Sequence, residues 1–216
     1  MDIYITIVGF FQSGGIFMYP IVLILALGLA IALERWLYLS KARITNQLVW
    51  RKLQPLLQNG DHQQAAQVIA KSKAALSNIL AYGMNRARTS ARRDDVEIAM
   101  EEGLMETLPH LEKRTPYLAT FANIATLLGL LGTIIGLIQA FTAVANANPA
   151  EKADMLSASI SVAMNTTAFG LMVAIPLLLI YAVLQTRTTQ IVDSIEMASV
   201  KFLNMLTDRP TSRSTA

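Results

Sequence analysis

Three long runs of the chain carry no charged side chain, and they dominate the pattern of hydrophobic and polar positions. They cover residues 3–33, 115–150 and 155–186. Each is longer than the roughly 20 residues that an α-helix needs to cross the hydrocarbon core of a bilayer. Backbone groups in lipid have to be hydrogen-bonded within the segment, so we expect each run to be helical. The pattern predicts an all-α membrane protein with three long transmembrane helices that extend into a cytoplasmic helical bundle.

Glycine, proline and charged positions give the expected borders of the segments. Gly14, Gly15 and Pro20 interrupt the first run, so a short interfacial helix on the periplasmic side is expected before the first transmembrane helix. The expected division is an N-terminal interfacial helix at 1–15, transmembrane helices at 16–39, 116–145 and 158–186, a cytoplasmic helical region at 40–115, a short periplasmic loop at 146–157, and a cytoplasmic C-terminal helix and tail at 187–216.

The polar region between the first two membrane segments also has helical signals. Asn59-Gly60 is a break, and Asp61 is placed to cap an Ala-rich helix in residues 62–76. A second helix is expected from about Asp94, with acidic residues in its first half and basic ones at its end, which complements the helix dipole. We interpret this region as a bundle that extends the membrane helices; a docking platform for a soluble regulator is the alternative.

The basic residues predict the orientation in the membrane. Residues 41–114 hold twelve Lys and Arg, whereas the loop between the second and third membrane segments holds only Lys152. Four more follow the third segment: Arg187, Lys201, Arg209 and Arg213. By the positive-inside rule the N-terminus is periplasmic and the C-terminus cytoplasmic, and Trp36 and Tyr38 fit the aromatic belt at the inner interface.

Composition excludes several classes of function. The chain is 53% hydrophobic and 15% charged with a mean hydropathy of +0.43, as is typical of a polytopic membrane protein. It has no cysteine, and His62 and His110 have no partners at ligand spacing, so neither a metal nor a cofactor is expected. Phosphate-binding and hydrolase motifs are also missing. We expect neither an enzyme nor a nucleic-acid-binding protein, and the remaining common energy source is an ion gradient.

Small and hydroxyl residues share one helical face in each of the last two membrane segments. In the second segment these are Thr126, Gly129, Thr133, Gly136 and Ala140, and in the third they are Ser159, Ala163, Thr166, Thr167, Gly170 and Ala174, before Pro176 interrupts the ladder. Close helix packing is one explanation. The other is a polar face around a foreign helix, for which Gly129, Gly132 and Gly136 would make room.

Neither of these segments contains a group that could carry a proton. No ionisable Asp, Glu, Lys, Arg or His lies between Arg114 and Glu151 or between Asp154 and Arg187. Intramembrane carboxylates are common proton relays, and a hydroxyl does not titrate near neutral pH. If protons cross here, the titrating group must come from another chain.

Three stretches resemble the MotA/TolQ/ExbB proton-channel family: residues 14–39 (GGIFMYPIVLILALGLAIALERWLYL), 127–141 (LLGLLGTIIGLIQAF) and 166–181 (TTAFGLMVAIPLLLIY). The three expected spans resemble the ExbB/TolQ branch, since the MotA branch has four. The first of the three stretches is ExbB-like. The resemblance implies a bacterial inner-membrane homopentamer around two copies of a single-span ExbD/TolR-type subunit, whose intramembrane aspartate binds the proton. It further implies that a TonB- or TolA-like protein passes the work to the outer membrane.

The resemblance also assigns roles to individual residues. Thr133 and Thr167 match the family's threonines in the second and third spans and are expected to face the partner's aspartate, while Pro176 matches its proline. The expected ion pathway comprises Thr133, Thr167, Thr166, Asn165 and Ser159, and the expected helix-packing residues are Gly129, Gly132, Gly136, Gly170 and Pro176. Val162 stands where many relatives of this family have Glu, so any role of that Glu is absent here or unnecessary.

These inferences predict a subunit that couples the proton motive force to TonB-dependent uptake at the outer membrane. A TolQ-type subunit for envelope maintenance stays open, as do sodium coupling and a passive membrane scaffold held by small-residue packing. A self-sufficient channel is the remaining alternative.

Overall fold

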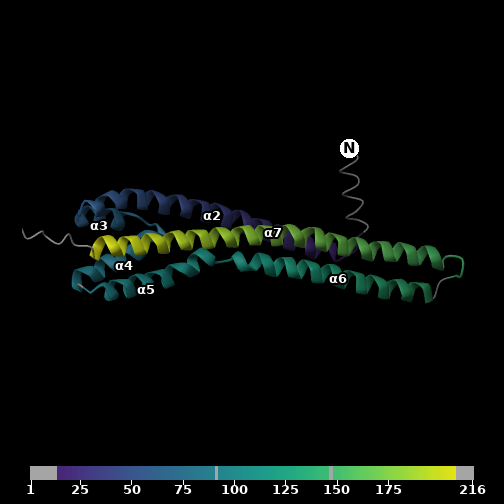
Figure 1. Cartoon of the computed structure of the whole chain (residues 1–216). Coiled ribbons are helices and arrows are strands. Elements are labelled where there is room, and N and C mark those ends of the chain that lie inside the picture. The colour runs from purple at the N-terminus through teal and green to yellow at the C-terminus, as the bar shows by residue number, and fades with distance from the viewer. Residues whose placement is uncertain (1–13, 91, 146–147, 208–216) are drawn as a thin grey trace, which may run out of the picture. The chain divides into compact units, whose positions relative to one another are not determined.

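The computed structural model describes residues 14–90, 92–145 and 148–207, and it is built from helices. In chain order these are α2 (Met18–Gln58), α3 (His62–Lys71), α4 (Ala75–Thr89), α5 (Arg93–Glu112), α6 (Thr115–Ala145) and α7 (Lys152–Thr207) (Figure 1). The described residues contain no strand, which confirms the all-α fold. Most of the interfacial helix expected at residues 1–15 lies outside the described residues.

Three helical stretches are long and apolar enough to cross a membrane, which confirms the expected number. They are Met18–Gln58, Arg93–Ala145 and Lys152–Leu206, and each contains an 18-residue window with a mean hydropathy of 2.0 or more. The first and third of these stretches, α2 and α7, continue without a break past the C-terminal ends of the charge-free runs that predicted them. The membrane borders themselves stay predictions.

The chain divides into two compact units, and the long helices contribute to both. Unit 1 comprises Met1–Glu34 and Arg114–Val183, and unit 2 comprises Arg35–Lys113 and Leu184–Ala216. Unit 1 thus contains the first part of α2, all of α6 and the first part of α7. Unit 2 contains the remaining parts of α2 and α7 together with α3, α4 and α5.

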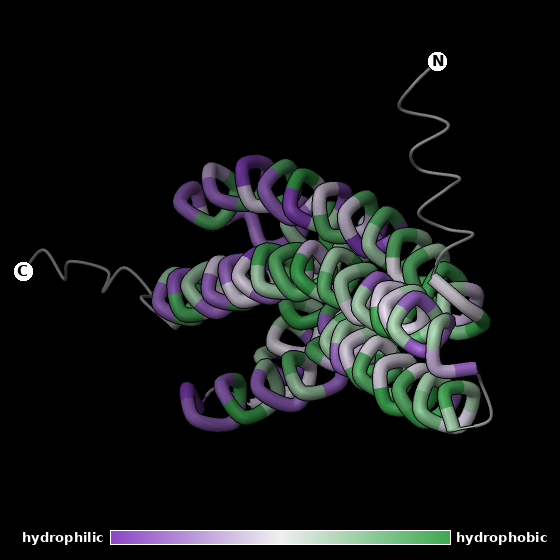
Figure 2. Tube along the Cα trace, turned by 90° about the vertical axis from the view of Figure 1, so that its right-hand side faces the viewer, coloured by the Kyte–Doolittle hydropathy of each residue, from purple (hydrophilic) through white to green (hydrophobic). Residues whose placement is uncertain are grey.

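Unit 1 is held together by close contact between α6 and α7, which lie side by side in Figure 1. The buried residues of α6 between Leu118 and Ala140 are small: Ala122, Ala125, Gly129, Gly132 and Ala140. Large side chains such as Leu127, Ile134 and Ile138 are exposed instead, and green, the colour of hydrophobic residues, predominates over this part of the chain in Figure 2. An apolar surface of this kind is suited to lipid or to other membrane helices.

Unit 2 forms the helical bundle that the sequence predicts for the polar region, but with different helix ends. Asp61 caps α3 as expected, since its Oδ1 accepts a hydrogen bond from the backbone N–H of Gln64 at 3.0 Å. Gly60 has a φ of +74°, the left-handed conformation that favours glycine at such a break. The Ala-rich helix ends at Lys71 and α4 starts at Ala75, so the expected continuous helix over 62–76 is wrong.

Pro176 lies inside α7, which continues through it, as expected for a proline within the third membrane segment. A proline inside a helix removes one backbone hydrogen bond, and in a long membrane helix the neighbouring contacts can offset that loss. Pro176 itself is exposed. The proline therefore interrupts the backbone hydrogen bonds of the third membrane segment at one position without ending the helix.

Candidate functional site

The contact between α6 and α7 is close because glycine lies on both helices. A Cβ added at Gly170 would lie 2.7 Å from the carbonyl oxygen of Ala125 and 3.1 Å from the Cα of Gly129. A Cβ added at Gly129 would lie 3.2 Å from the Cα of Thr167. Backbone atoms cannot move aside as the end of a flexible side chain can. The two backbones meet here, as small-residue packing in membranes allows.

The other two glycines of α6 face the same helix. A Cβ at Gly132 would lie 2.5 Å from Cγ2 of Thr166, and one at Gly136 would lie 2.8 Å from Cβ of Ala163. The expectation that Gly129, Gly132 and Gly136 make room for a foreign helix is therefore wrong in this fold. The room they leave is filled by α7 of the same chain.

Thr167 links α7 to α6 through its hydroxyl. Its Oγ1 donates to the carbonyl oxygen of Gly129 at 2.7 Å, and the side chain is partly buried. Gly129 precedes Thr133 by four residues, which is about one helical turn. The structure thus brings the two threonines singled out by the sequence to neighbouring levels of one helix pair.

Thr133 lies beside the contact face of α6 and is partly exposed. Its Oγ1 donates to the carbonyl oxygen of Leu130 at 2.6 Å, within its own helix. Thr126, two turns earlier, makes the same kind of bond to the carbonyl oxygen of Ala122 at 3.1 Å. A hydroxyl that donates in this way still has lone pairs that accept a hydrogen bond. Thr126 and Thr133 together offer two acceptors on one side of α6.

Thr166 is placed differently from its neighbour Thr167. Only 2% of its surface is exposed, and its Oγ1 contacts the carbonyl oxygens of Gly14 and Val162. Its hydroxyl is therefore used inside the unit, where it ties α7 to the segment that precedes α2. Val162 supplies one of these two carbonyls through its backbone.

Ser159 and Asn165 are both partly buried on α7. Asn165 has an interaction within the protein. Gly170 lies in the close contact described above, and Pro176 lies on the exposed side of α7. In the described residues no group of three or more His, Cys, Asp or Glu is arranged to hold a metal ion.

Arg35 is a buried charge that the sequence reading did not single out. It is 2% exposed in unit 2, where its Nη2 donates to the carbonyl oxygen of Leu111 at 2.5 Å and its guanidinium lies 4.6 Å from the ring centre of Tyr38. Leu111 lies in the last turn of α5, whose terminal carbonyls have no partner within the helix. The spacing of residues along α2 could have indicated that Arg35 is buried. Arg35 follows Ile21, Gly28 and Ala32, all buried, at intervals that place the four residues on one helix face.

Glu34, the neighbour of Arg35, belongs to unit 1 and pairs with Arg114 there. Arg114 Nη1 lies 3.0 Å from Glu34 Oε2. Arg114 has a φ of +66°, which a non-glycine residue adopts only at a cost in free energy, and it lies between the ends of α5 and α6. The second helix of the polar region, which was expected to have basic residues at its end, stops at Glu112, and Lys113 and Arg114 lie just beyond it.

The sequence is similar to those of known proteins. Residues 71–197 match the MotA/TolQ/ExbB proton channel family. The chain is 31% identical over 194 residues to an ExbB homolog of Methanothermobacter thermautotrophicus, which covers 89% of this chain and 67% of that protein. It is 29% identical over 186 residues to an ExbB-like biopolymer transport protein of Synechocystis, covering 85% of this chain and 72% of the relative. The Tol-Pal system protein TolQ of Haemophilus influenzae is 37% identical over 93 residues, which is 43% of this chain and 40% of TolQ.

Proposed function

The chain belongs to the MotA/TolQ/ExbB proton channel family, and we propose that it is the multi-pass subunit of an inner-membrane motor energised by the proton motive force. The proposed complex is a homopentamer around a single-span ExbD/TolR-type subunit, and a TonB-like protein carries the work to the outer membrane. The N-terminus is periplasmic and the C-terminus cytoplasmic in this proposal, as the basic residues favour.

One observation carries the proposal. The described part of α6 contains no ionisable Asp, Glu, Lys, Arg or His, and neither does α7 between Asp154 and Arg187, yet Thr133 and Thr167 lie at neighbouring levels of this pair. Hydroxyls cannot carry a proton near neutral pH, but they can hydrogen-bond a group that does. The proton carrier is then a carboxyl group on the partner, and this chain provides polar contacts along an otherwise apolar path.

We place the partner helix on a face of α6 that is not packed against α7. Gly129, Gly132 and Gly136 pack on α7, so we place the partner beside Thr126 and Thr133. Both hydroxyls donate to their own helix and can accept a hydrogen bond from a protonated carboxyl group. A deprotonated carboxylate instead requires donors, so these hydroxyls would have to turn. The free energy of the partner helix at this place beside α6 thus depends on whether its carboxyl group is protonated. Such a dependence is required if proton flow is to move the partner.

Substitution of Thr133 by valine tests this function, because valine keeps the shape and removes the oxygen. In cells that carry the complete complex, T133V should abolish gradient-dependent uptake while the amount of assembled complex stays unchanged. T142V is the matched control, since Thr142 is exposed on α6 and its Oγ1 likewise donates to a carbonyl of its own helix, that of Ile138 at 2.8 Å. Normal uptake in T133V would contradict the proposed role, and equal loss in T142V would assign the effect to helix stability.

A TolQ-type role in envelope maintenance is the second candidate, favoured by the similarity to TolQ of Haemophilus influenzae. The two roles differ in what fails when the gene is deleted. Loss of TonB-dependent uptake with an intact outer membrane supports the ExbB-type role. Detergent sensitivity and leakage of periplasmic proteins with normal uptake support the TolQ-type role. A passive scaffold predicts that collapsing the proton gradient leaves either function unchanged.

A further inference from the structure

A small basic pocket lies between α2 and α7 within unit 2. Its volume is about 300 Å³, and Arg43 of α2 and Arg187 of α7 both line it. None of its lining residues is acidic. Two positive charges therefore share one cavity with no carboxylate among its walls, and an anion is the complementary ligand.

The remaining walls suit a phosphate group on an apolar stem. Ser40, Gln47 and Gln190 supply a hydroxyl and two amide groups that donate hydrogen bonds. Leu39 and Ile191, both buried, supply an apolar floor. The volume is at the lower end of the roughly 300–1,000 Å³ that is typical of small-molecule sites. A headgroup fits in it, while longer chains have to stay outside.

Arg187 is held in place before any ligand binds. Its guanidinium lies 3.6 Å from the ring centre of Trp36, in a cation–π contact. Stacking occupies a face of the planar guanidinium and leaves its edge donors available for the two-point contact that phosphate favours. Trp36 does not line the pocket itself but holds Arg187 in place there, and the exposed side chain of Arg43 supplies the second positive charge of the lining.

The position along the chain places the pocket at the height of lipid headgroups. Arg187 is the first charged residue after the charge-free run at 155–186, and Trp36 follows the run at 3–33 by three residues. Aromatic and basic residues at the ends of such runs mark the membrane–water interface, here the cytoplasmic one by the distribution of Lys and Arg. Basic pockets between membrane helices on this side are suited to anionic headgroups.

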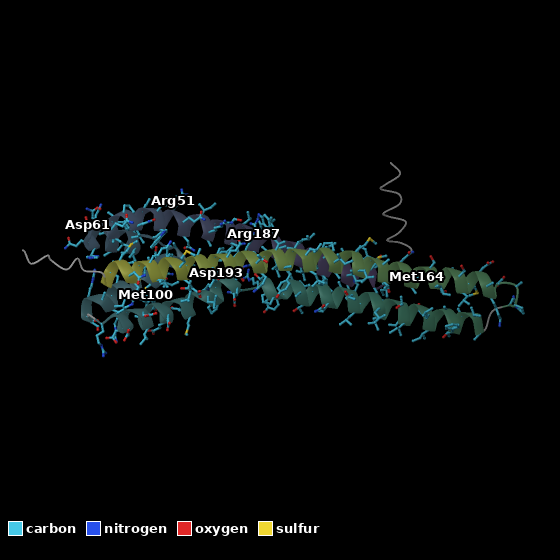
Figure 3. All side chains as sticks on the ribbon, viewed as in Figure 1. Arg51, Asp61, Met100, Met164, Arg187 and Asp193 are labelled. Carbon is cyan, nitrogen blue, oxygen red and sulfur yellow. The ribbon has the colours of Figure 1, made fainter. Side chains whose placement is uncertain are left out.

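From these observations we infer that the pocket binds the phosphate of an anionic phospholipid of the inner leaflet. Figure 3 labels Arg187 on α7 together with Asp193, an exposed acid six residues further along that does not line the pocket. The same figure labels Arg51 on α2, an exposed arginine that also lies outside the pocket. A lipid bound here contacts α2 and α7 together, at the interface where both helices leave the membrane.

Native mass spectrometry of the purified full-length protein with added phosphatidylglycerol or phosphatidylcholine tests the inference. Phosphatidylglycerol should be retained and phosphatidylcholine should not. R43Q and R187Q should each weaken retention about fivefold, and the double variant about 25-fold, if each arginine contributes as one basic residue near an anionic surface does. R51Q is the matched control and should retain the lipid like the wild type. Unchanged retention in the double variant, or an equal loss in R51Q, would overturn the inference.

Two further measurements test the lipid site if a variant does not fold or if the ligand is a soluble anion. If R187Q fails to fold, R43Q alone decides, because the side chain of Arg43 is exposed: a fivefold loss supports the site and unchanged retention overturns it. Inorganic phosphate at millimolar concentration should not displace the lipid. If phosphate instead binds in a way that needs both arginines while phosphatidylglycerol is not retained, the ligand is a soluble anion and the lipid assignment is wrong. Neither readout depends on ion coupling, so failure here leaves the proposed function untouched.

Discussion

The hydroxyl of Thr167 on α7 donates to the carbonyl oxygen of Gly129 on α6 across 2.7 Å. This bond forms where the two backbones are close enough that a Cβ on Gly129 would lie 3.2 Å from the Cα of Thr167. The same threonine therefore has two roles in our account, one in joining the helices and one in the proposed proton path.

A pair of substitutions at Thr167 separates these two roles. T167S keeps the hydroxyl and should retain gradient-dependent uptake, whereas T167V loses the bond to Gly129 and should abolish uptake. The loss of one such hydrogen bond should lower the free energy of unfolding by about 1 kcal/mol, so T167V should still assemble. Uptake and the amount of complex in the membrane are measured together. Equal uptake in T167S and T167V would contradict a role for the hydroxyl.

Substitution of Gly170 by alanine should separate α6 from α7. The added Cβ would lie 2.7 Å from a backbone oxygen, that of Ala125, so the helices have to move apart at a cost of roughly 1–3 kcal/mol. G28A is the comparison, because its Cβ would meet Cδ2 of Leu177, also at 2.7 Å, and that flexible side chain can shift. Thermal unfolding in detergent should show a larger loss for G170A than for G28A. The reverse order would contradict the described contact.

Removal of the guanidinium of Arg35 should destabilise unit 2. R35M keeps much of the apolar stem but leaves the carbonyl of Leu111 without this donor, and a hydrogen bond to a charged group contributes about 1.5–3 kcal/mol. R51Q removes an exposed arginine of the same helix and should change the melting temperature little. Thermal unfolding followed by circular dichroism measures both. Equal melting temperatures of R35M and wild type would contradict the buried position.

Asp95 should show a lowered pKa that depends on Ser90. The hydroxyl of Ser90 donates to Asp95 Oδ2 at 2.5 Å, and this bond, aided by Arg92, lowers the pKa of the carboxyl group. A lowered folded-state pKa stabilises the fold above the unfolded pKa, and that contribution is lost as the pH falls through the folded value. S90A should move the pKa of Asp95 back up, which NMR titration of the labelled carboxyl detects. S72A, which removes the hydroxyl of a serine at the end of another helix, α3, is the control and should leave the pKa of Asp95 unchanged.

The number and type of the membrane helices could be predicted because a helix needs a charge-free run of about 20 residues to cross the bilayer. Helix ends in the polar region could not, because charge does not end a helix. For example, α2 ends at Gln58, well beyond Leu33, the last residue of the first charge-free run. Asp61 was an exception, since its capping chemistry is local in sequence.

The faces of α6 were predicted less well than the helix itself. Gly129 and Gly136 were placed correctly on the small-residue side. Ala125 and Gly132 also contact α7, while Thr126 and Thr133 are more exposed. Alanine is equally compatible with lipid and with a packed contact, so the pattern alone does not fix the rotation of the helix. Arg35 was missed because a charge at the end of an apolar run is usually expected to face water.

Proton flux into proteoliposomes that contain only this chain tests the central claim most directly. The claim is that the membrane part supplies hydroxyls and close packing, and that the carboxyl group which binds the proton belongs to a partner. With an imposed potential and a pH-sensitive dye inside, flux should equal that of empty liposomes and rise only when a single-span partner with an intramembrane aspartate is added. A gradient-driven flux from this chain alone would contradict the claim.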